Sequence, residues 1–163
     1  MTNRTDDLLR PSLQDVRNPP AGGRPWRLSS QFYVAFFGGA LAVTALAWLN
    51  AVRLGATRDT KRWILVTGTV GVVVSIVVSY IFFGDDYGSA ARIGYRVVGV
   101  VTSIVLYRLQ RSADRVYQFR KPGSDDEQYD RMLAPGLVAI LAGGVLQLAI
   151  VFAGMSLIDR IIG

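Results

Sequence analysis

Few side chains in this chain of 163 residues could do chemistry, and the commonest catalytic types are missing. The sequence contains neither Cys nor His. A thiolate nucleophile, a disulfide framework and the usual zinc ligands are therefore absent, and so is the most frequent general base. No glycine-rich phosphate loop or dinucleotide fingerprint is present either. We predict a non-enzymatic protein that uses no metal ion and no cofactor.

The remaining polar candidates lie within or beside apolar segments. Arg92 and Arg96 are four residues apart and would share one face of a helix, close to the acidic pair Asp85 and Asp86. They form either an interfacial ion pair that seats this helix or an anion-binding or proton-linked site, and we favour the ion pair. Two carboxylates are too few for a calcium site. Gln147 is the one strongly polar side chain in the middle of the last apolar segment.

Four apolar segments must position these side chains. The clearest covers residues 63–83, which carry no charge and have the length of a helix that crosses about 30 Å of hydrocarbon. The others cover residues 32–50, 90–109 and 133–158. The segment 90–109 is the weakest, because its crossing has to include Arg96, at a cost of about 2.5–3.5 kcal/mol in a helix centre and less near an end. The pattern predicts an all-α integral membrane bundle of four transmembrane helices.

Polar segments divide the chain. Residues 1–30 are rich in Pro and Gly, which predicts a flexible polar N-terminal tail before a transmembrane domain over residues 31–163. Residues 110–132 form a connection within that domain, first basic and then acidic. The net charge of +6 is placed beside apolar spans, which favours anionic lipid headgroups over nucleic acid as the partner.

Small residues recur along the apolar segments and predict close helix packing, because they let helix backbones approach each other in lipid. Within residues 63–83 they repeat every four positions, as a small-residue stripe formed by Thr67, Gly71, Ser75 and Ser79. Gly38, Gly39 and Gly143 are further packing candidates. The stripe could instead line a permeation path. We favour packing, because none of its members is ionisable.

The first apolar segment opens on a familiar pattern. Residues 36–55 read FFGGALAVTALAWLNAVRLG. They resemble small uncharacterised bacterial multi-pass membrane proteins with an FGGPLAG-like opening, a following Asn and an RLG turn. The matching positions are Phe37, Gly38, Gly39, Leu41, Asn50, Arg53, Leu54 and Gly55, whereas the family's Pro position is Ala40 here. The resemblance implies further membrane spans and brings no activity with it.

These observations predict a small multi-pass membrane protein that acts by helix association. It would be an accessory subunit, a scaffold or a homo-oligomer, with other membrane proteins or copies of itself as partners beside the lipid bilayer. The alternative is a transporter or channel component with a polar lining around Arg92, Arg96 and Gln147.

The distribution of Lys and Arg predicts an orientation in the inner (plasma) membrane, with one conflict. The basic loops 51–62 and 110–132 are expected in the cytoplasm, and the acidic turn 84–89 outside. Four full crossings would then place the N-terminal tail outside, despite its Arg17, Arg24 and Arg27. A segment 32–49 that dips in and returns near Gly38 and Gly39 would remove the conflict, but its bend would need protein cover. We favour the full crossing.

Overall fold

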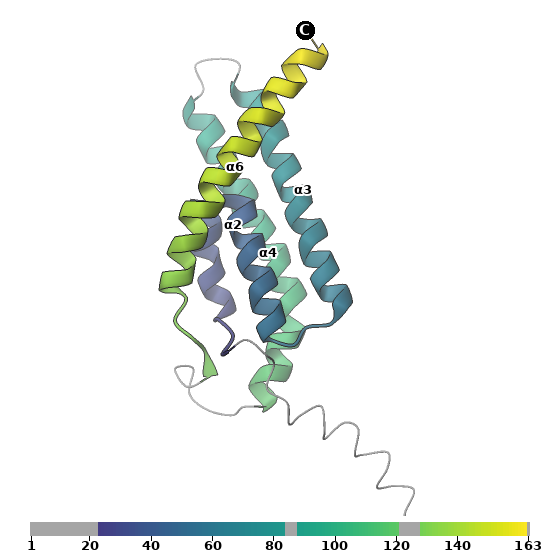
Figure 1. Cartoon of the computed structure of the whole chain (residues 1–163), viewed down its shortest axis with the longest axis vertical. Coiled ribbons are helices and arrows are strands. Elements are labelled where there is room, and N and C mark those ends of the chain that lie inside the picture. The colour runs from purple at the N-terminus through teal and green to yellow at the C-terminus, as the bar shows by residue number, and fades with distance from the viewer. Residues whose placement is uncertain (1–22, 84–87, 121–127, 163) are drawn as a thin grey trace, which may run out of the picture.

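The computed structural model describes residues 23–83, 88–120 and 128–162, and at residues 83, 88–92, 120 and 162 only the backbone is described. The acidic pair Asp85 and Asp86 and most of the expected N-terminal tail lie outside these residues. Within them the regular structure is helical, joined by short turns and loops, with one isolated bridge between Trp26 and Asp130. The elements are η1 (Leu28–Ser30), α2 (Gln31–Arg53), α3 (Arg58–Phe83), α4 (Gly88–Arg120) and α6 (Leu133–Ile162). The predicted all-α bundle of four long helices is confirmed (Figure 1).

Three stretches in the described part of the chain are long and apolar enough to cross a membrane. They are Leu28–Arg53, Arg58–Phe82 and Leu133–Ile161. The helix α4 has 33 residues, because it continues past the expected end at residue 109 through a strongly polar stretch to Arg120. Its apolar part is interrupted by Arg96, the feature that made this segment the weakest in the sequence.

The helix α2 folds back on itself. At Gly39 the backbone leaves the helical conformation (φ 76°, ψ −168°), which separates two helical halves, 31–38 and 40–53. Gln110 Nε2 donates a hydrogen bond to Gln31 Oε1 at 3.2 Å, and Asn50 Nδ2 donates one to Gln110 Oε1 at 3.4 Å. In one straight helix Gln31 and Asn50 would be about 28 Å apart, too far for a single side chain to reach both. The two halves therefore form an antiparallel pair, the α2 hairpin, with its turn at Gly39 (Figure 1).

This geometry corrects the expectation that residues 32–49 cross the bundle in one pass. Both ends of α2 lie at the same end of the bundle, as the alternative with a return near Gly38 and Gly39 requires. The physical reason is the conformation of Gly39, which lies in a backbone region open almost only to glycine. A straight apolar helix and a helical hairpin of the same length share one composition, so hydropathy does not separate them.

The α2 hairpin forms the centre of the bundle, and α3, α4 and α6 pack around it. In the most apolar part of each stretch, 56% of the residues are buried in the stretch that contains α2, 28% in α3 and 17% in α6. The helices α3 and α4 run antiparallel, since Gly71 lies against Thr102 whereas Gly94 lies against Val78. One buried cluster joins both halves of the hairpin to α3 and α4 and contains Ala35, Val43, Ala47, Ala51, Ile64 and Leu106.

Glycines on the surrounding helices let the α2 hairpin approach closely. A Cβ atom on Gly99 of α4 would lie 2.5 Å from the carbonyl oxygen of Ala35, and one on Gly143 of α6 would lie 2.8 Å from the Cα of Ala42. Contacts this short leave no room for a side chain, so the helix backbones touch here. Close backbone contact through small residues is the usual way in which helices pack within lipid.

Candidate functional site

The turn of the α2 hairpin is held by a buried polar network. The backbone N–H of Leu41, in the first turn of the second helical half, donates a hydrogen bond to Gln147 Oε1 at 2.7 Å. Gln147 Nε2 in turn donates to Ser75 Oγ at 3.2 Å, and the Ser75 hydroxyl donates to the carbonyl oxygen of Gly71 at 2.8 Å. The N–H groups of a first helical turn have no partner within their own helix. Gln147 therefore caps the second half of the hairpin from α6.

A tyrosine covers the other side of the same turn. The hydroxyl of Tyr95 on α4 donates a hydrogen bond to the carbonyl oxygen of Gly38 at 3.3 Å. A Cβ atom on Gly39 would collide with this hydroxyl and lie 2.7 Å from Gln147 Oε1. Non-helical backbone at membrane depth is tolerated only where protein or water covers it. Here α3, α4 and α6 together provide that cover.

This cluster can hold a structure but offers little for catalysis. Its members are an amide, hydroxyls and backbone groups, and the hydrogen bonds of Gln147 and Ser75 are all made within the chain. None of them titrates near neutral pH. Within the described residues there is also no group of three His, Cys, Asp or Glu side chains that could hold a metal ion.

The small-residue stripe of α3 faces the interior of the bundle. Gly71, Ser75 and Ser79 are buried and Thr67 is half-buried. A Cβ atom on Gly71 would lie 2.6 Å from Thr102 Oγ1 and 3.0 Å from the Cβ of Ala40. The stripe is thus filled by contacts within the chain and does not lie on the outer surface.

A second polar cluster lies at the end of the bundle where α2 begins and ends, and the sequence analysis did not single it out as a site. Asn50 Oδ1 accepts a hydrogen bond from the backbone N–H of Trp26 at 2.7 Å, and Asn50 Nδ2 donates one to the carbonyl oxygen of Trp26 at 3.1 Å. The side-chain amide of Asn50 therefore pairs with both the N–H and the carbonyl group of Trp26, two residues before η1. Its place in the family-like pattern, shortly before the RLG turn, was the only signal for this role.

The RLG turn itself ends the second half of the hairpin. Gly55 has φ 66°, and the N–H of Ala56 donates to the carbonyl oxygen of Ala51 at 2.9 Å. A glycine with positive φ just past a helix, with backbone hydrogen bonds around it, is a common C-terminal cap. The chain can then turn sharply into α3.

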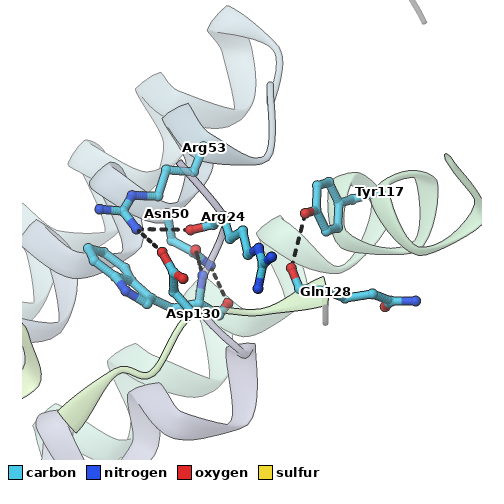
Figure 2. Close-up of polar contacts among 7 residues, drawn as sticks. Arg24, Asn50, Arg53, Tyr117, Gln128 and Asp130 are labelled. Carbon is cyan, nitrogen blue, oxygen red and sulfur yellow. Dashed lines mark hydrogen bonds and ion pairs between the residues drawn. The ribbon is translucent and has the colours of Figure 1, made fainter. Parts of the chain in front are cut away.

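Arg53 joins the hairpin to the segments that precede α2 and α6. Its Nη1 donates to the carbonyl oxygen of Arg24 at 2.9 Å and lies 3.5 Å from Asp130 Oδ2, as Figure 2 shows. The guanidinium carbon also lies 3.9 Å from the ring centroid of Trp26. Next to it is an open pocket of about 620 Å³ that Arg24, Arg53, Asp130 and Arg131 help to line. Three Arg and one Asp give this pocket a positive balance.

The polar extension of α4 supports the same end. The hydroxyl of Tyr117 donates to the carbonyl oxygen of Gln128 at 3.0 Å (Figure 2). Burial raises the pKa of Tyr117 above its ordinary value, so the hydroxyl keeps its proton and remains a donor at neutral pH. The backbone N–H of Asp130 donates to the carbonyl oxygen of Pro25 at 3.0 Å. These hydrogen bonds connect the segment just before α6 to α4 and to the N-terminal segment.

Of the remaining polar candidates, the structure describes the side chains of Arg96 and Gln147, and these two do not meet in one site. Gln147 is fully buried, whereas Arg96 is exposed on the outer face of α4, with its guanidinium carbon 5.0 Å from the ring centroid of Phe36. The side chain of Arg92 lies outside the described residues, as do Asp85 and Asp86. No family model, curated protein or solved structure matches the chain.

Proposed function

We propose that the chain is a small multi-pass membrane protein that acts by association, as an accessory subunit, a scaffold or a homo-oligomer, and that it is not an enzyme. One observation carries the proposal: the α2 hairpin fills the centre of the bundle, and side chains of α3, α4 and α6 pair with the polar backbone groups at its turn. A filled interior leaves the outer surface as the place where the protein meets other molecules.

The outer faces of α3 and α6 are the proposed association surface. The helix α6 is the least covered of the three apolar stretches and exposes large side chains along its whole length. Examples are Leu141, Leu148 and Phe152. Since the small-residue stripe of α3 is already used inside the chain, association would rest on shape and dispersion between these outer faces and a partner.

We also propose the inner membrane as the location, with the basic end in the cytoplasm and the acidic turn 84–89 outside. The α2 hairpin supports this orientation because it brings the N-terminal segment to the same end as the other basic segments. The described Lys and Arg residues at this end are Arg24, Arg27, Arg53, Arg58, Lys61, Arg62, Arg108, Arg111, Arg115 and Arg131. The positive-inside rule then applies without the conflict that a straight α2 would create.

Photo-crosslinking in native membranes tests the association. A benzophenone amino acid is placed singly at Leu141, Leu148 and Phe152 on α6 and at Val73 on α3, all of which are exposed. We expect protein adducts at a subset of these positions that share one helix face, either to a second copy or to another membrane protein. Adducts to lipid alone at all four positions would contradict association through the membrane helices.

Transport is the second candidate function, and the broken helix favours it. Discontinuous membrane helices form the substrate sites of many transporters. In this chain the N–H of Leu41, at the start of the second half, already donates its hydrogen bond to Gln147. This pairing argues that the break in the helix is structural. The two functions separate in liposomes that contain the purified chain. A solute flux above that of empty liposomes would favour transport, whereas no such flux supports association.

A further inference from the structure

Arg96 is a charged side chain on a face of α4 that is otherwise apolar. Its neighbours along this face are Ile93, Val97 and Val101, all of which are exposed. Among the described residues its guanidinium lies over the ring of Phe36 and forms no ion pair. A guanidinium surrounded by lipid is costly unless it reaches the interface or a counter-charge. A counter-charge beyond the described residues, from the acidic turn or from outside the chain, would lower this cost.

The direction of α4 brings Arg96 toward the end of the bundle that carries the acidic turn. Side chains on a helix tilt toward its N-terminus, and α4 begins at Gly88 on that side. Arg96 is eight residues into the helix, which corresponds to about 12 Å along its axis. A long Arg side chain can extend from such a depth toward the lipid headgroups. The phosphate groups of that leaflet are abundant anions at this level of a membrane.

A groove of about 270 Å³ lies beside the Arg96 guanidinium, and we call it the Arg96 groove. Its other walls are apolar and come from Phe36 of the hairpin and from Ile93, Val97, Val100 and Val101 of α4. One cationic side chain beside apolar walls suits an anionic amphiphile, because its charged head can pair with Arg96 while its hydrocarbon chain contacts the apolar side chains. A soluble anion would leave the apolar walls without a partner.

We propose that the Arg96 groove binds one phospholipid. The phosphate accepts hydrogen bonds from the Arg96 guanidinium, whose planar fork suits two phosphate oxygens, and an acyl chain lies along Val97, Val100 and the ring of Phe36. Because Phe36 belongs to the first half of the α2 hairpin, the bound lipid touches the hairpin three residues before its turn. This inference goes beyond the proposed association, since its ligand is a lipid and its site is not on α6.

Lipid retention by the purified full chain tests the site. The protein is stripped of lipid in mild detergent and titrated with dioleoylphosphatidylglycerol or with dioleoylglycerol, which has the same acyl chains and no phosphate, and bound lipid is counted by native mass spectrometry. We expect Arg96→Gln to weaken binding of the phospholipid about tenfold, the loss of one good charge-assisted contact, and to leave dioleoylglycerol unchanged. Val100→Trp, which fills the groove and keeps the charge, should weaken both lipids.

Arg160→Gln is the matched control, because Arg160 is an exposed Arg in the last turn of α6 and lies outside the groove. It should retain the phospholipid as the unchanged chain does. Equal retention in Arg96→Gln, or equal loss in Arg160→Gln, would overturn the proposal. So would displacement of the lipid by 10-fold excess inorganic phosphate, which would indicate a water-borne anion. A dimer that is lost in Arg96→Gln and forms without lipid would indicate a protein carboxylate instead. Photo-crosslinking at α6 is independent of these results.

Discussion

At the residue scale, Gly39 decides the path of the chain. Its φ of 76° and ψ of −168° are open almost only to glycine, and a Cβ atom would collide with Tyr95. We expect Gly39→Ala to lower the free energy of unfolding by about 2–4 kcal/mol, because backbone strain and overpacking add. Thermal unfolding of the purified protein in detergent measures the change.

Gly144→Ala is the matched control for this substitution. Gly144 lies in a regular part of α6, and a Cβ atom there would meet only the Cα of Gly38, at 3.9 Å. The change should alter stability by less than about 1 kcal/mol. Equal destabilisation by Gly39→Ala and Gly144→Ala would show that the turn does not depend on the conformation of Gly39.

The Gln147 side chain carries the second residue-scale prediction. In Gln147→Leu the N–H of Leu41 loses its partner inside the bundle, so we expect a loss of about 1–3 kcal/mol in unfolding free energy. Ser156→Leu serves as the control, because Ser156 is an exposed polar residue on the same helix. Hydrogen exchange at the Leu41 amide should also become faster in Gln147→Leu. Unchanged exchange there would contradict the capping role.

Sequence reasoning identified these residues one by one and missed how they are connected. Gly38, Gly39 and Ser75 stood out as small residues that allow close helix packing, and Gln147 stood out as a strongly polar residue within an apolar run. Their pairing depends on contacts between residues separated by 72 or 106 positions, which composition and spacing do not encode. Asn50 was noticed only within the family-like pattern, since an amide at the end of an apolar run looks like an ordinary helix boundary.

At the element scale, the α2 hairpin is the feature that hydropathy alone could not decide. The segment is long enough to cross a membrane, and its two halves bury residues on all sides, so its pattern fits a straight central helix equally well. The basic N-terminal segment was the better indicator, because a full crossing would have separated it from the other basic segments. In α4 the helix continues past residue 109, the end that the apolar pattern predicted, because the polar stretch up to Arg120 is also helical.

Spin-label distances test the hairpin directly, since the chain has no native Cys. Labels at Ser29→Cys and Val52→Cys would be about 34 Å apart on a straight helix. In the hairpin both positions lie at the same end of adjacent halves, so we expect a distance below about 20 Å including the labels. The pair Arg58→Cys and Ile81→Cys has the same separation on α3 and should give about 34 Å. A long distance for both pairs would contradict the hairpin.

At the scale of the whole molecule, the hairpin gives the bundle an odd number of full passes. The helices α3, α4 and α6 each run from one end to the other, whereas α2 begins and ends at the basic end. The bridge between Trp26 and Asp130 joins the segments before α2 and α6 there, and the ion pair of Arg53 with Asp130 joins the end of α2 to the same segment before α6. The described basic residues of the connections 51–62 and 110–120 and of the N-terminal segment therefore lie at the same end of the bundle, and positive charge of this kind attracts an anionic leaflet.

Membrane topology follows from this arrangement and can be measured with single cysteines at Ser29, Thr57, Ser89 and Ser112. An impermeant maleimide is added to intact spheroplasts and, in parallel, to permeabilised ones. We expect Ser89→Cys, at the start of α4, to react in intact spheroplasts, and the other three to react only after permeabilisation, because the hairpin and the positive-inside rule place them together in the cytoplasm. Reaction of Ser29→Cys but not Thr57→Cys in intact spheroplasts would mean that α2 crosses the membrane. If Ser29, Thr57 and Ser112 all react and Ser89 does not, the hairpin stands and the orientation is reversed.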